Sequence, residues 1–112
     1  MKLRALSIRQ PQAEAIMRGV KTTEYRKRPT NIRGRVYVYA SLGRYSTAEE
    51  AELMAKYGIE DVSCDDLPRG VIVGTVDLCD CDGGEWHLRD PERAKRLRKP
   101  KNKPQPVWFN PF

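Results

Sequence analysis

The sequence predicts a small α+β protein in which a twisted sheet of five to six strands closes partly into a barrel, with two or three short flanking helices. Residues 35–41 alternate cleanly along a strand, and residues 71–79 form a long β-branched run that is apolar on both faces. Residues 47–57 show a helical repeat between a start signal and a stop signal. A chain of 112 residues can bury one modest core, so we expect a single domain over residues 1–112.

The chain is expected to begin with a strand and a short helix. Residues 3–8 mix apolar side chains with polar ones, which suits a strand with one buried face. Pro11 ends this strand and occupies a probable first helical position, where its missing N–H costs nothing. The helix is predicted over residues 11–18, and Gly19 ends it.

Two strands with a basic loop between them are expected next. Residues 22–26 have the β-branched and aromatic content of a strand, and Pro29 stops it. Residues 27–33 form the loop. In the strand at 35–41, three small apolar residues share one face and two tyrosines share the other.

The middle of the chain predicts a surface helix. Thr47 followed three residues later by Glu50 has the spacing of a capping box, and Gly58 closes the apolar stripe. We expect an amphipathic helix over residues 47–57.

The last third predicts a central strand followed by less regular structure. Gly74, inside the strand at 71–79, suggests a bulge or a bend at a barrel corner. A short strand is expected at 85–88, and Asp90 followed by proline could begin a helix. Residues 107–109 are apolar enough to dock as a last strand.

The charge is uneven along the chain. The 21 basic residues exceed the 15 acidic ones by six. Residues 1–35 carry ten basic against two acidic residues, residues 36–90 four against twelve, and residues 91–112 seven against one. If the two ends meet, as they often do in small domains, the protein has a basic face. A basic face favours phosphates, and nucleic acid is its commonest partner; solubility alone is the other explanation.

Composition also predicts the cellular compartment and whether a metal is bound. No apolar run approaches the roughly 20 residues that span a bilayer, and the N-terminus lacks a signal-peptide core, so we expect a cytoplasmic protein with no membrane partner. The cysteines Cys64, Cys79 and Cys81 cannot all pair internally and are expected to be free thiols. Cys79 and Cys81 with His87 fit no common zinc spacing, so no metal is predicted.

Residues 19–26 spell Gly-x-Lys-x-x-Glu-x-Arg, with Lys21, Glu24 and Arg26 at the charged positions. Together with residues 6–11 and 34–41, this segment closely resembles the ASCH domain, the activating signal cointegrator homology family. The resemblance continues downstream and leaves out chiefly the region 44–66; the downstream segments are 70–76, 86–96 and 104–109.

The resemblance implies a PUA-like β-barrel with flanking helices. Members of the family are generally proposed to bind RNA or modified nucleosides in a cleft beside the Gly-x-Lys-x-x-Glu-x-Arg segment. A small bacterial branch instead hydrolyses N4-acetylcytidine to cytidine and acetate, with a lysine and a threonine of this segment and a downstream glutamate.

Lys21 and Glu24 decide between these implications. Lys21 matches the family lysine, and a buried lysine can act as a base or bind a phosphate. Glu24 stands where the hydrolytic branch has threonine, and a shift of one residue to Thr23 would turn that side chain to the other face of a strand. A carboxylate can accept hydrogen bonds from the exocyclic amine of a base, or it can pair internally with Lys21 or Arg26.

Further residues complete the predicted ligand-binding set. Arg26 or Arg9 can hold a phosphate or stack on a base, and Ser7 and Gln10 lie where a strand end meets a helix start. Asp77 sits where an acid of the late strand could face the pocket. One or two of five aromatic residues are expected to line the cleft; these are Tyr25, Tyr37, Tyr39, Trp86 and Trp108.

The sequence thus predicts a protein that binds RNA or a modified nucleoside through Lys21, Glu24 and Arg26 without a cofactor; it favours a monomer but does not determine the oligomeric state. A small amidohydrolase acting on N4-acetylcytidine, with Lys21 as the catalytic residue, is the first alternative. Ribonuclease-type hydrolysis, with one histidine and a lysine, is the second.

Overall fold

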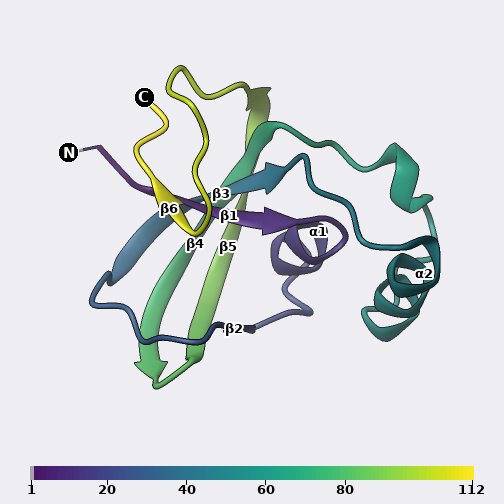
Figure 1. Cartoon of the computed structure of the whole chain (residues 1–112), viewed down its shortest axis with the longest axis horizontal. Helices are drawn as coiled ribbons and strands as arrows, with labels where there is room; N and C mark the ends of the chain where they lie inside the picture. The colour runs from purple at the N-terminus through teal and green to yellow at the C-terminus, as the bar shows by residue number, and fades with distance from the viewer. Residues whose placement is uncertain (1) are drawn as a thin grey trace.

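One six-stranded sheet organises the molecule (Figure 1). The structure is a computed structural model and describes residues 2–112. Its strands lie in the order β2-β5-β4-β3-β1-β6. The elements are β1 (Ala5–Arg9), α1 (Gln12–Met17), β2 (Thr23–Tyr25), β3 (Gly34–Ser41), α2 (Thr47–Lys56), the 3-10 turn η1 (Cys64–Asp66), β4 (Val71–Asp82), β5 (Glu85–Arg98) and β6 (Trp108–Phe109).

The sheet curls into a half-barrel. β1 pairs in parallel with β3, and the remaining neighbours are antiparallel. The long β4–β5 hairpin shifts register three times, and such bulges bend and twist strands. This architecture confirms the predicted small α+β, PUA-like barrel with two helices and one short helical turn. None of the helices within residues 2–112 has the length and apolar character that crossing a membrane requires.

The core lies between the sheet and α1. Ile16 and Met17 of α1 pack with side chains from β1, β3, β4 and β5. The charged end of α1 is tied down as well, because Arg93 on β5 donates two hydrogen bonds, of 2.8 and 3.0 Å, to the buried carboxylate of Glu14. A smaller cluster around Tyr39 and Ile72 is covered by the C-terminal segment.

The helix predicted from Asp90 is wrong. β5 runs without a break from Glu85 to Arg98 and pairs with β4 along its length. Asp90 adopts a positive φ of 52°, a conformation that aspartate tolerates better than most residues. Proline at 91 is accepted because β2 pairs only with residues 85–87, which leaves the outer edge of β5 open at that point.

α2 begins where the sequence predicts a helix, but its cap lies one residue earlier. The Ser46 hydroxyl accepts a hydrogen bond from the Glu49 N–H at 3.1 Å and donates one to the Glu49 carboxylate at 2.9 Å, so Ser46 is the N-cap of α2. Glu50 is therefore free to turn inward. It is the buried residue of α2, while Leu53 and Tyr57 are only half-buried.

Gly84 in the β4–β5 turn offers a test of how the strands are held. A Cβ at this position would collide with the Arg26 carbonyl oxygen, and the Arg26 N–H donates to the Gly84 carbonyl at 2.8 Å. Gly84→Ala is therefore expected to lower the free energy of unfolding by about 1–3 kcal/mol in urea titrations. Gly83→Asn, at a neighbouring open left-handed position, should be nearly neutral. Equal effects would contradict the close approach.

Candidate functional site

A cavity of about 760 Å³ opens beside the ends of β1 and β3. The short strand β2 forms one wall, α2 a second, and the loop before β6 a third. Its lining mixes charged, aromatic and small polar side chains. The lining residues are Ser7, Arg9, Gln12, Lys21, Glu24, Tyr25, Arg26, Tyr39, Ser41, Leu42, Gly43, Tyr45, Leu53, Lys56, Tyr57, Lys103, Pro104, Gln105, Pro106 and Val107.

Three charged side chains of the Gly-x-Lys-x-x-Glu-x-Arg segment meet at the wall formed by β2. The Lys21 ammonium lies 3.2 Å from Glu24 Oε1, and Arg26 Nε donates to Glu24 Oε2 at 2.6 Å. The side chains of Lys21 and Glu24 are only 5% and 8% exposed. Lys21 also donates to the Thr23 carbonyl at 2.7 Å. We call these three residues the charged triad; with all three ionised, its net charge is +1.

The guanidinium of Arg26 is held from two further sides. It donates to the Ser7 carbonyl oxygen at 3.0 Å, which joins β2 to β1. It also lies 5.6 Å from the centroid of the Trp86 ring, and Trp86 stacks on Trp108 with 5.8 Å between centroids. These contacts fix the planar guanidinium beneath the cavity, so that the triad is a rigid part of the fold.

Tyrosine rings surround the same space. The Tyr25 and Tyr57 rings lie 5.6 and 6.0 Å from the Lys21 ammonium. The Arg9 guanidinium is 5.1 Å from the Tyr45 centroid, and the Tyr45 hydroxyl accepts a hydrogen bond from Gln12 at 3.2 Å. Burial raises the pKa of the Tyr45 hydroxyl, although the nearby Arg9 opposes the shift. The Tyr45 ring is therefore a neutral aromatic surface at physiological pH.

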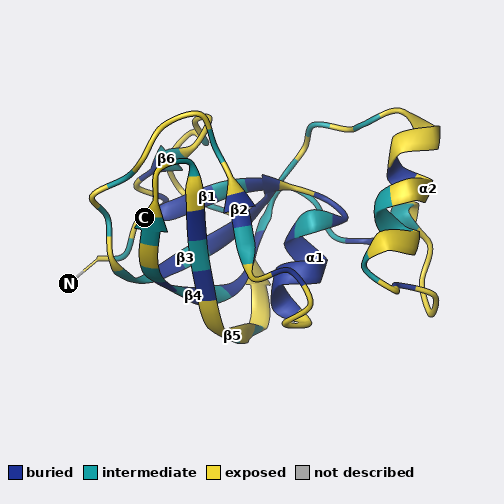
Figure 2. Cartoon of the chain, turned by 90° about the horizontal axis from the view of Figure 1, so that it is seen from below, coloured by how far each residue is buried: buried dark blue, intermediate teal, exposed yellow. Residues whose placement is uncertain are grey.

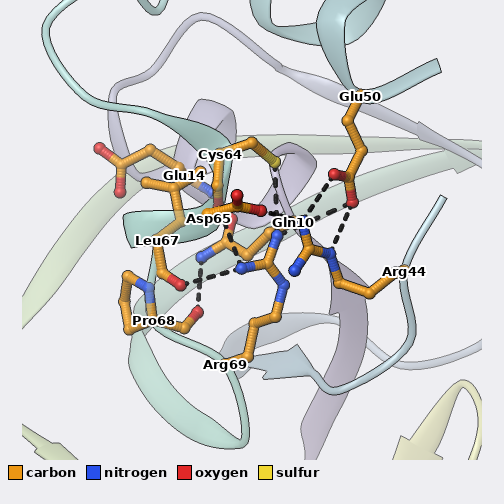
Figure 3. Close-up of polar contacts among 9 residues, drawn as sticks. All are labelled: Gln10, Glu14, Arg44, Glu50, Cys64, Asp65, Leu67, Pro68 and Arg69. Carbon is orange, nitrogen blue, oxygen red and sulfur yellow. Dashed lines mark hydrogen bonds and ion pairs between the residues drawn. The ribbon is translucent and has the colours of Figure 1, made fainter. Parts of the chain in front are cut away.

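An ionic cluster built around the buried Glu50 carboxylate holds α2 beside the cavity (Figure 3). Arg44 donates two hydrogen bonds to the Glu50 carboxylate, at 2.8 and 2.7 Å, and a third to Asp65 at 2.6 Å. Arg69 approaches the same carboxylate at 3.9 Å and donates to the carbonyl of Cys64 at 3.0 Å. Figure 2 shows that α2 stands apart from the sheet and is exposed over most of its surface. The ionic cluster thus attaches α2 to the rest of the fold, as apolar packing attaches α1.

Five of the predicted site residues line the cavity and two lie elsewhere. Ser7, Arg9 and the charged triad face it. Gln10 is fully buried below it, donates to the Pro68 carbonyl at 2.9 Å and accepts from the Glu14 N–H at 2.9 Å. Asp77 accepts a hydrogen bond from Arg89 at 2.8 Å and is not among the lining residues.

Two of the five predicted aromatic candidates, Tyr25 and Tyr39, line the cavity. Trp86 and Trp108 support Arg26 from below, and Tyr37 packs edge-on against Phe112. Sequence reasoning missed Tyr45, Lys56 and Tyr57, which lie in the region 44–66 that the resemblance leaves out, and Lys103, which lies in the loop before β6. The one available signal, for Tyr45, was that residues 42–45 directly follow the strand at 35–41.

The groups invoked for other chemistry are not gathered in the cavity. Thr22, Thr23 and His87 are absent from its lining. The Cys79 and Cys81 thiols donate to backbone carbonyls of His87 and Gly83. Among the residues that the structure describes, no three His, Cys, Asp or Glu side chains gather as metal ligands would.

Fold and cavity together define a PUA-like half-barrel with a cationic, tyrosine-lined pocket. The chain belongs to the ASCH domain family, whose model matches residues 6–108. It is 40% identical over 80 residues to the human protein Activating signal cointegrator 1 and 41% identical over 80 residues to the mouse protein of that name. Each alignment covers 68% of this chain but only 14% of the relative, so the likeness concerns one small part of those proteins.

The triad predicts a distinct order of stabilities. Glu24→Ala leaves the buried Lys21 ammonium without its carboxylate and should lower the free energy of unfolding by about 3–5 kcal/mol. Lys21→Met should cost clearly less, because Glu24 keeps its hydrogen bond from Arg26. Urea unfolding of both variants measures the order. A larger loss for Lys21→Met would contradict the central place of Glu24.

Glu50 predicts a pH dependence. Hydrogen bonds from Arg44 lower its pKa to about 2, against the opposing effect of burial, from an ordinary value of 4.5. Because the folded-state pKa is depressed, this stabilisation is present above about pH 4.5 and is lost as the pH falls toward 2. Unfolding measured at pH 5 and pH 3 should show a smaller pH-dependent loss for Glu50→Gln than for wild type. Equal losses would show that the cluster does not hold this carboxylate.

Proposed function

We propose that this chain binds RNA by taking one nucleotide into the cavity beside the charged triad. The observation that carries the proposal is the combination of aromatic faces and unneutralised cations in one 760 Å³ space. Single-stranded nucleic acid is bound by this combination, since bases stack on rings and phosphates approach cations. The family resemblance supports the same partner.

The cations at the rim are available to phosphates. Arg9, Lys56 and Lys103 line the cavity, and none of them forms an ion pair with any residue from 2 to 112. Arg9 contacts the Tyr45 ring, so one edge of the cavity presents a cation beside a stacking surface. A nucleotide offers the matching pair of a charged phosphate and an aromatic base.

Glu24 supplies the element that can discriminate among bases. Its carboxylate has about four acceptor positions, of which Lys21 and Arg26 use two. The remaining positions can accept from the exocyclic amine of cytosine, adenine or guanine, whereas uracil offers a carbonyl at the equivalent place. The internal ion pairs and ligand recognition are therefore compatible.

Hydrolysis of N4-acetylcytidine is the second candidate, and the observation in its favour is the buried Lys21 ammonium in a cavity of nucleoside size. Two observations weigh against hydrolysis. Lys21 is already committed to Glu24 and to the Thr23 carbonyl, and neither neighbouring threonine lines the cavity. Incubation with N4-acetylcytidine distinguishes the two: release of cytidine that disappears in Lys21→Ala would replace the binding proposal by catalysis.

Removal of the Tyr45 ring tests the binding proposal. Fluorescence anisotropy with a short labelled single-stranded RNA should show about 5- to 150-fold weaker binding for Tyr45→Ala, which corresponds to 1–3 kcal/mol of lost stacking at one base. Tyr45→Phe keeps the ring and should bind within a few fold of wild type. Unchanged affinity in Tyr45→Ala, or equal loss in both variants, would contradict stacking at this position.

A further inference from the structure

We infer that residues 95–103 form a second anion-binding surface, which takes the phosphates of nucleotides that flank the one in the cavity. We call these residues the basic arm. The inference rests on the proposed function and narrows it, because it makes the ligand an RNA strand of several nucleotides, with a free nucleoside bound only weakly.

The first observation is the charge of the basic arm. It contains six cationic residues within nine positions, and no acidic residue follows Glu92 in the chain. All six are exposed, and none forms an ion pair with a residue in the part of the chain that the structure describes. The six are Lys95, Arg96, Arg98, Lys99, Lys101 and Lys103.

This lack of internal partners sets the arm apart from the basic residues beside it. Arg93, two residues before the arm, is neutralised by Glu14, and Arg35 lies 3.6 Å from Glu92. Six cations within so short a segment repel one another and produce a strong positive electrostatic potential around it. A polyanion relieves this repulsion and releases its own counterions on binding.

The second observation is a hollow at the start of the arm. A cavity of about 560 Å³ lies along β5, and its lining includes Lys95, Arg96 and Arg98 together with the ring of Tyr37. The Arg98 guanidinium lies 4.2 Å from the centroid of Phe112 and donates to the Tyr37 hydroxyl at 3.3 Å. A guanidinium that is already held against a ring has little side-chain freedom left to lose, so phosphate binding costs less entropy there.

The third observation is continuity. From the end of β5 the chain folds back toward β6 (Figure 1), and Lys103 on this return path lines the first cavity. The return path is anchored, because the N–H groups of Lys101 and Asn102 donate to the Pro111 carbonyl and the Ser7 hydroxyl donates to the Gln105 carbonyl at 2.7 Å. The arm therefore links the two hollows by a fixed row of cations.

An RNA strand suits this row better than an added protein strand. The open edge of β5 could in principle pair with another chain, but bulges and charged side chains along an edge oppose such pairing. Phosphates need neither a straight edge nor free backbone groups.

A pair of double variants tests the inference. Lys95→Ala/Arg96→Ala removes two cations of the arm. Lys27→Ala/Arg28→Ala removes the same two residue types from an exposed loop after β2, which pairs with β5 at residues 85–87. The last residue of β2, Tyr25, pairs with Glu85, so at about 3.3 Å per residue this loop lies roughly 30 Å along β5 from Lys95. The probes are a labelled oligocytidylate of about eight nucleotides and cytidine 5′-monophosphate.

The arm variant should bind the oligonucleotide about tenfold more weakly and reduce the slope of log K against log salt by about 1.4. Its affinity for the mononucleotide should stay unchanged, and the loop variant should match wild type for both probes. Equal behaviour of the two variants, or equal loss for both probes, would overturn the inference. So would an oligoglutamate peptide that binds wild type as tightly as the RNA.

The outcomes also separate this inference from the proposed function. If wild type binds the mononucleotide as tightly as the oligonucleotide, the inference about the basic arm is wrong, while the proposal that the cavity binds a nucleotide is unaffected. If oligonucleotide binding depends on Lys95 and Arg96 but not on Tyr45, the basic arm binds the RNA and the proposal that the cavity takes a nucleotide is wrong.

Discussion

The buried carboxylate of Glu24 is the constraint on which the candidate site depends. It lies on a strand of only three residues, yet it pairs with Lys21 on one side and Arg26 on the other. Without it two cations would face each other in a poorly solvated wall, at a high cost in free energy. Through Arg26 the same carboxylate reaches the Ser7 carbonyl and the Trp86 ring, so it couples β2 to β1 and to the core. A short edge strand thereby becomes one rigid wall of the cavity.

The wall of the cavity formed by α2 is held by a different kind of interaction. α2 has little buried apolar surface and is attached through the Arg44, Glu50 and Arg69 cluster (Figure 3). Charge pairing is directional and depends on pH, whereas the apolar packing of Ile16 in α1 has no preferred direction and does not depend on pH. The cavity thus has one wall fixed by the core and one held by ions. Its rim adds Arg9, Lys56 and Lys103, which form no ion pair within residues 2–112, and this excess of cations supports the proposed binding of an anionic ligand.

Much of this arrangement could be read from residues, and the failures have definite causes. Alternation at 35–41 and the Gly-x-Lys-x-x-Glu-x-Arg spacing were enough to predict β3, the triad and the family. The extent of β5 was not, since Asp90 followed by proline carries a strong local helix signal that pairing with β4 overrides. Tyr45 and Tyr57 escaped because they lie in the region 44–66, outside the recognised segments, and only the tertiary fold brings Tyr45 against Arg9 and Tyr57 beside Lys21. Gln10 and Asp77 were placed by sequence adjacency, and their bonds to Pro68 and Arg89 belong to other parts of the fold.

The proposed function requires that RNA enter the cavity between the triad and the tyrosine rings. Titration of the ¹⁵N-labelled protein with a short single-stranded RNA, followed through its backbone amide resonances, tests this claim most directly. We expect the largest shifts on residues 21–26, on Gly43 and Tyr45 after β3, and on Tyr57 at the end of α2. Shifts confined to the β4–β5 turn or to the loop at 27–33, with these residues unchanged, would contradict it.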